Sequence, residues 1–107
     1  MSLSNVDIII LCDLYGGLLT KRQLEMLRLY YDYDNSLSEI AQIHGVTRQA
    51  VHDAINKGVA MLEAFEKKLR LKEKSEKISA LADKILSEKA GEEISSAAEK
   101  IKKILSE

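Results

Sequence analysis

Apolar residues recur along this chain at intervals of three and four positions, and no stretch alternates apolar and polar residues at every second position. This spacing predicts amphipathic helices and argues against strands. It predicts helices over residues 5–15 and 21–32, a short helix between residues 36 and 45, and a long helix over residues 47–72. Because the chain also contains no proline, the sequence predicts an all-α fold.

Hydroxyl residues mark where these helices are expected to begin. Three of them stand three positions ahead of an acidic or amide side chain, which is the spacing of a capping box. The pairs are Ser4 with Asp7, Thr20 with Gln23, and Ser36 with Glu39. Thr47 is expected to cap the long helix. Tyr15, Tyr30, Tyr31 and Tyr33 are expected to be core residues with their hydroxyls at the rim.

Residues 36–58 predict a helix-turn-helix, in which a short helix, a tight turn and a second helix follow one another. Gly45 is expected to end the first helix, because glycine adopts a left-handed conformation without steric cost. Four apolar side chains should then pack the two helices together, namely Ile40, Ala41, Val51 and Ile55. The second helix would keep a polar outer face, as in proteins that read the major groove of DNA.

That outer face supplies the candidate nucleic-acid-binding residues, which are Arg48, Gln49, His52, Asn56 and Lys57. Arginine can donate two hydrogen bonds to guanine, glutamine can pair with adenine, and a lysine can contact a phosphate. Asp53 opposes this interpretation, unless its carboxylate accepts from a cytosine amine or restrains Arg48 or Lys57. The alternative is that these side chains form an ordinary solvated helix surface.

Beyond residue 66 the composition changes. Residues 67–77 are a charged junction, after which aromatic residues are absent and two further amphipathic helices are predicted, separated by Gly91. The sequence therefore predicts a helix-turn-helix domain at residues 4–73 and a helical appendage at residues 74–107. Helices this short are marginal without packing. A homodimer is expected, because the apolar first helix and the appendage offer more apolar surface than one small body can cover.

Charge weakens the expectation of DNA binding. The 107 residues carry a net charge of −1, with five basic and nine acidic residues in 1–66 and eleven basic and eight acidic in 67–107. Phosphate contacts supply most non-specific affinity for DNA. The lysines and arginine of residues 67–74 could contact RNA or an anionic lipid surface, but such runs are usually solvated.

Other kinds of function find little support. The glycines show no phosphate-loop spacing, the two histidines and single cysteine do not supply four clustered zinc ligands, and no catalytic constellation is evident. We therefore expect no enzymatic activity, no metal and no cofactor. The apolar run at residues 6–12 is too short to cross a bilayer, and no basic segment precedes it as in a signal peptide.

Five runs of residues carry a resemblance to a known family: 15–23, 29–31, 36–41, 48–51 and 65–69. They resemble the YlxM family of small bacterial proteins. The stretch of residues 37–55, preceded by residues 19–23, also resembles in pattern the C-terminal DNA-binding region of sigma factors (region 4). The resemblance covers about residues 7–72. It implies a cytoplasmic, non-enzymatic, all-helical protein that regulates the signal recognition particle pathway, with components of that particle as partners. His44 stands where the family usually has a large apolar residue, so Ile43 is expected to take the inward position.

The sequence thus leads to a regulatory binding protein as the first hypothesis. Two alternatives stay open. One is a sequence-specific DNA-binding regulator that uses Arg48, Gln49, His52 and Asn56. The other is a protein-interaction module in which the helix-turn-helix serves only as a scaffold.

Overall fold

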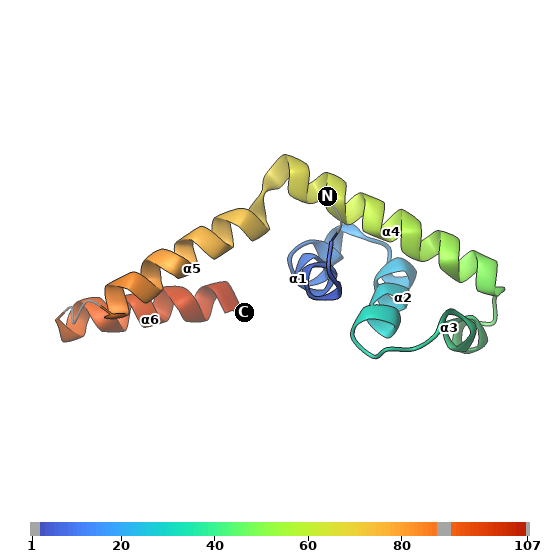
Figure 1. Cartoon of the computed structure of the whole chain (residues 1–107), viewed down its shortest axis with the longest axis horizontal. Coiled ribbons are helices and arrows are strands. Elements are labelled where there is room, and N and C mark those ends of the chain that lie inside the picture. The colour runs from blue at the N-terminus through green and yellow to red at the C-terminus, as the bar shows by residue number, and fades with distance from the viewer. Residues whose placement is uncertain (1–2, 88–90, 107) are drawn as a thin grey trace. The chain divides into compact units, whose positions relative to one another are not determined.

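The computed structural model describes residues 3–87 and 91–106, and the regular structure in these ranges is entirely helical (Figure 1). The all-α prediction is confirmed. The elements are α1 (Asn5–Tyr15), a 3-10 turn (Gly16–Leu18), α2 (Lys21–Tyr31), α3 (Leu37–His44), α4 (Arg48–Leu69), α5 (Leu71–Ser87) and α6 (Glu92–Ser106). The chain divides into two compact units, the N-terminal unit ending at Arg70 and the C-terminal unit beginning at Leu71.

All three predicted capping boxes are present. In each, the hydroxyl oxygen accepts from a backbone N–H three residues later at 3.1 Å, and the acidic or amide side chain accepts from the backbone N–H of the capping residue. The hydrogen bonds that Glu39 accepts from Ser36 hold the pKa of its carboxyl below the usual value. Thr47 caps α4 by accepting from the N–H of Ala50 at 3.1 Å.

The core of the N-terminal unit forms where α1, α2 and α3 each pack against α4. Its buried members come from every helix of the unit and are Ile8, Leu11, Cys12, Tyr15, Leu19, Met26, Leu27, Ile40, Ala41, Val51, Ile55 and Leu62. Tyr15 is 1% exposed, and its hydroxyl donates to Glu66 Oε1 at 2.7 Å. This bond ties the end of α1 to the last turns of α4.

Gly58 lets α2 and α4 approach each other closely. It is buried in α4, and a Cβ placed there would lie 3.0 Å from Cδ1 of Leu27, which is itself 0% exposed. The sequence indicated no more than a small cost in helix propensity at this position. The structure shows that the absence of a side chain is what allows Leu27 to pack there.

Three expectations were wrong. The long helix ends at Leu69 and not near residue 72, because Arg70 adopts a left-handed conformation (φ 55°) and its N–H closes the last turn on Glu66 O at 2.8 Å. Tyr33 and Tyr30 are not core residues, since they are 71% and 36% exposed. Ile43 is not inward but 61% exposed, because the buried stripe of α3 runs through positions 37, 40, 41 and 44 and position 43 lies outside it.

The C-terminal unit is a hairpin of two antiparallel helices, α5 and α6 (Figure 1). Ala82 and Ala98 are its buried apolar residues, each 2% exposed. Lys102 of α6 forms an ion pair with Asp83 of α5. Across the described part of the chain, no helix has the combination of length and apolar character that a membrane span requires.

Candidate nucleic-acid interface

The turn between α3 and α4 fixes how α4 is presented. Gly45 adopts the predicted left-handed conformation, at φ 65° and ψ 37°, and the N–H of Val46 donates to Ala41 O at 3.0 Å. Ile40 and Val51, both 0% exposed, lie in the core formed by the packing of α3 and α4. The first turns of α4 therefore have a fixed outward face, as a helix-turn-helix requires.

All five candidate residues are exposed on α4. Successive residues of a helix are about 100° apart around its axis. Relative to the buried positions 51, 55, 58 and 62, Gln49 and Asp53 therefore lie opposite the buried face, with Asn56 and Lys57 on either side of them. His52 lies on the flank of the helix, and Arg48 lies towards the edge of the buried face. The structure thus places Asp53 at the centre of the outward face, with Lys57 and the two amide side chains around it and Arg48 at its margin.

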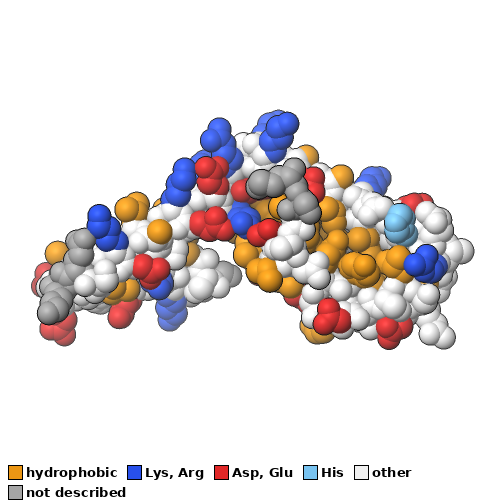
Figure 2. Space-filling model, in the orientation of Figure 1, with side chains coloured by type: hydrophobic (Ala, Val, Ile, Leu, Met, Phe, Trp, Pro, Cys, Tyr) orange, Lys and Arg blue, Asp and Glu red, His pale blue; other side chains and the backbone are white. Residues whose placement is uncertain are grey.

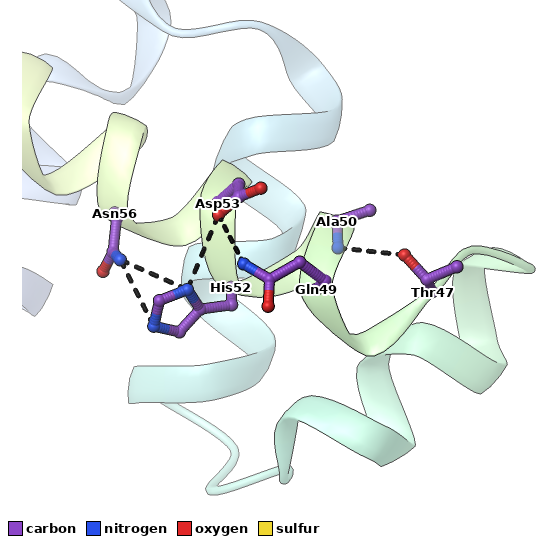
Figure 3. A network of polar contacts seen from close by, with 6 residues as sticks. All are labelled: Thr47, Gln49, Ala50, His52, Asp53 and Asn56. Carbon is purple, nitrogen blue, oxygen red and sulfur yellow. Dashed lines mark hydrogen bonds and ion pairs between the residues drawn. The ribbon is translucent and has the colours of Figure 1, made fainter.

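A chain of polar contacts runs along this face (Figure 3). Nε2 of Gln49 donates to Oδ1 of Asp53 at 2.9 Å, and the same oxygen lies 3.6 Å from Nδ1 of His52. Nδ2 of Asn56 lies 3.4 Å from Nε2 of His52. The partners of Asp53 are therefore Gln49 and His52, where the sequence had suggested Arg48 or Lys57. The carboxylate occupies one donor of Gln49 and leaves its amide oxygen to accept from another group.

The charges on α4 do not form a continuous positive face. Asp53 lies between Arg48 and Lys57, and Glu63 lies between Asn56 and Lys67 along the outward side. Alternating signs of this kind give a weaker attraction for phosphates than a row of cations would. Nucleic-acid binding through α4 would consequently depend on base contacts more than on its charge.

A second group of cations lies close to the end of α3. Lys21 and Arg22, from the first turn of α2, line a shallow depression of about 380 Å³ together with Glu25 and His44. Sequence reasoning missed this cluster, because nothing local indicates that the start of α2 meets the end of α3. The cluster adds two exposed cations near the turn that leads into α4.

Arg28 has a structural role instead. Its guanidinium forms ion pairs with Asp13 at 2.8 Å and with Asp32 at 3.2 Å. Partial burial on its own would lower the pKa of Arg28, but the hydrogen bonds to Asp13 and Asp32 raise it. Arg28 thereby links α1 to α2, and its guanidinium is engaged in these two ion pairs.

An apolar groove of about 550 Å³ lies between α2 and α3. Its lining residues are Leu24, Glu25, Arg28, Leu29, Tyr33, Ile43 and His44. Apolar side chains also gather over α1 and α2 on the face seen in Figure 2.

In the described residues, no group of three or more histidine, cysteine or acidic side chains is arranged to hold a metal ion. The N-terminal unit thus offers two surfaces, the polar face of α4 and this groove.

Comparison with known proteins identifies the family. A family model described as "Putative helix-turn-helix protein, YlxM / p13 like" matches residues 4–104. A UPF0122 protein of Shouchella clausii is 43% identical over 98 residues, which cover 88% of this chain and 90% of the relative.

Two further UPF0122 proteins match a shorter region. The one from Clostridium acetobutylicum is 50% identical over 64 residues, or 60% of this chain and 55% of the relative. The one from Symbiobacterium thermophilum is 52% identical over 62 residues, or 58% of each chain. The chain therefore spans little more than half the length of these two relatives. With the family model matching both units and a helix-turn-helix in the fold, the chain belongs to the UPF0122 family of YlxM / p13-like helix-turn-helix proteins.

Proposed function

We propose that this protein is a non-enzymatic regulator that binds duplex DNA with the outward face of α4. The observation that carries the proposal is the fixed presentation of that face, because α3 and α4 share a packed core and leave the polar side chains of α4 exposed. DNA is favoured over duplex RNA, since the major groove of A-form RNA is too narrow for a helix to read.

In this proposal each candidate residue has a role set by its place on α4. Arg48 contacts guanine and Gln49 contacts adenine through its free amide oxygen and second N–H. His52 and Asn56 contact the following bases, and Lys57 contacts a phosphate. Lys21 and Arg22, exposed beside the end of α3, contact the flanking phosphates.

The small number of cations gives the proposal a quantitative consequence. With about three or four phosphate contacts, the slope of log K against log salt should be about −3. Affinity should then fall by roughly 60-fold between 50 and 200 mM salt. A steeper slope would mean that cations outside this group, such as the lysines of the charged junction, also contact the nucleic acid.

A salt-dependent titration with duplexes selected from a random pool tests these roles. Arg48→Ala and Gln49→Ala should each weaken binding to the selected duplex by about 5- to 100-fold and relax the preference for one base pair. Asp53→Asn should strengthen binding, because it removes a negative charge from the centre of the face. Lys84→Ala, an exposed cation of α5, is the control and should change nothing. The proposal is refuted if no duplex is selected from the pool. It is also refuted if Arg48→Ala binds the selected duplex as tightly as the wild type does.

The resemblance to YlxM supports a finer version of this role. In that version the protein acts in the bacterial cytoplasm, as a homodimer, and regulates the signal recognition particle pathway. The same titration carried out with signal recognition particle RNA and with its protein components tests which ligand is preferred. Binding to the RNA with a flat response to Arg48→Ala would place recognition away from α4.

The apolar groove favours a second candidate, a protein-interaction module. Ile43 and Tyr33, which are 61% and 71% exposed, line the same groove, and apolar side chains exposed together in this way are typical of protein interaction sites. If Ile43→Asp abolishes binding to a signal recognition particle protein while the α4 variants retain it, this candidate replaces the first.

A further inference from the structure

The C-terminal hairpin leaves most of its large apolar side chains uncovered. Most of its isoleucine and leucine residues project from α5 and α6 with more than a third of their surface exposed. The exposed fractions are 44% for Ile78, 62% for Leu81, 37% for Ile85, 54% for Ile94, 42% for Ile101 and 69% for Ile104. Two helices of 17 and 15 residues that bury so little apolar surface are marginal in water, and a further packing partner would stabilise them.

These side chains share one face of the hairpin. Around the axis of α5, Ile78, Leu81 and Ile85 lie to one rotational side of Ala82, which marks the contact with α6. The exposed isoleucines of α6 lie to the same rotational side of Ala98. Because the helices are antiparallel, the same rotational side of each is the same face of the pair. The opposite edge of the contact is closed by the ion pair of Lys102 with Asp83.

We propose that this face is the seam of a homodimer, in which the hairpins of two copies pack together as a four-helix bundle. The inference concerns the hairpin alone and stands whether or not α4 binds DNA. A two-fold dimer needs a surface that is complementary to itself. Net charge does not oppose such pairing, since residues 71–107 contain eight lysines and eight acidic residues and two copies therefore carry no net charge to repel one another.

The composition of the face favours a second copy over an unrelated protein. Interfaces with other proteins are enriched in aromatic residues and arginine, whereas permanent homodimer interfaces resemble a hydrophobic core cut in half. Residues 71–107 contain no aromatic residue and no arginine. The face is built from isoleucine, leucine and alanine, which is the composition of a core.

The area is also of the right size. The six large side chains keep about half of their surface, on the order of 500 Å² per copy, so burying both faces would remove about 1,000 Å², the lower limit for a specific interface. Packing of Ala97 and of lysine stems beside the face against the second hairpin would extend it. An isolated hairpin would instead leave this whole area in water.

Sedimentation equilibrium of the full chain from about 1 to 100 µM tests the proposal. The wild-type chain should be dimeric at the upper concentrations. Leu81→Glu and Ile104→Glu should each weaken the dimer by at least about 100-fold, because a carboxylate would enter an apolar seam twice. The matched controls are Ala80→Glu and Lys103→Glu, which change neighbouring exposed positions on the polar side of the same helices and should leave the dimer unchanged.

A glutamate variant could lose the dimer because its helices unfold. Hydrogen exchange of the wild-type chain therefore tests the dimer without any substitution. Protection of amides in α5 and α6 should rise with protein concentration, while that of amides in α2 and α4 should not. A chain that stays monomeric at 100 µM overturns the proposal, as expected if its own N-terminal unit or another protein covers the face. The proposal is also overturned if both glutamate variants dimerise as strongly as the wild type. It is overturned as well if the amides whose protection rises with concentration lie in α1–α4.

Discussion

At the scale of single residues, Cys12 shows how burial alters chemistry. Its side chain lies in the core of the N-terminal unit and is 3% exposed. Burial raises the pKa of the thiol above its usual value of 9.0; the charge of Arg28 opposes this rise, and those of Asp32 and Asp13 add to it. The thiol is therefore protonated and shielded at neutral pH, which makes it a core side chain and a poor nucleophile.

The raised pKa predicts a loss of stability in alkali. As the pH rises, Cys12 ionises first in the unfolded chain, so its contribution to stability is complete below about pH 9 and is lost above it. Urea unfolding at pH 7 and pH 10 should show a smaller pH-dependent loss in Cys12→Ala than in wild type, after a loss of about 1 kcal/mol at pH 7 from missing contacts. Equal losses in the two proteins would show that the thiol is not the titrating group.

The candidate site could be predicted only in part from its sequence. Exposure of Arg48 and Gln49 follows from the helical period and from the inward positions of Val51 and Ile55, which are local facts. The contact of Gln49 with Asp53 depends on which rotamers the helix surface favours, and the nearness of Lys21 to His44 depends on packing between distant segments. The four-residue spacing of Gln49 and Asp53 allows their contact but does not select it over that of Asp53 with Lys57, and the approach of Lys21 to His44 leaves no signal in the spacing of residues. Base contact by these side chains remains a prediction.

At the scale of elements, Gly58 sets the contact between α2 and α4. Gly58→Ala should gain about 1 kcal/mol in helix propensity but force Leu27 out of its buried position, for a net loss of about 1–2 kcal/mol. Gly17→Ala is the control, since a Cβ there meets no atom within 4 Å. Urea unfolding measures both variants. A net gain at Gly58 would mean that Leu27 can repack and that the close approach is not needed.

Where helices begin was predictable, and where they end was less so. A capping box needs a hydroxyl and a carboxylate or amide three residues apart, and both are visible in the sequence. The end of α4 depends on the left-handed conformation of Arg70. Residues other than glycine seldom adopt this conformation, and no local sequence pattern predicts it here. The inward position of Ile43 was inferred from the histidine at position 44, where the family usually has a large apolar residue, but the phase of α3 is fixed by Ile40 and Ala41.

At the scale of the whole molecule, the two units differ in how they are stabilised. The buried cluster of twelve residues lies wholly in the N-terminal unit, whereas the C-terminal unit buries two alanines among its described residues. The first unit therefore contains its own core, and the second depends on a partner surface. Removing residues 71–107 should accordingly leave a folded, monomeric helix-turn-helix unit.

Thermal unfolding followed by circular dichroism distinguishes the two units. The truncated chain should unfold at a midpoint temperature that does not change with protein concentration. The full chain should show a helical transition whose midpoint temperature rises with concentration, because dimerisation stabilises only the associated form.

The truncated chain should bind a DNA with two half-sites 10²- to 10⁴-fold more weakly than the full chain does, since two linked helix-turn-helix units bind with a high effective concentration. A truncated chain that is unfolded would show that the N-terminal core is incomplete without the hairpin. Equal affinity for the two-site DNA would show that each copy binds alone and that the hairpin serves another purpose.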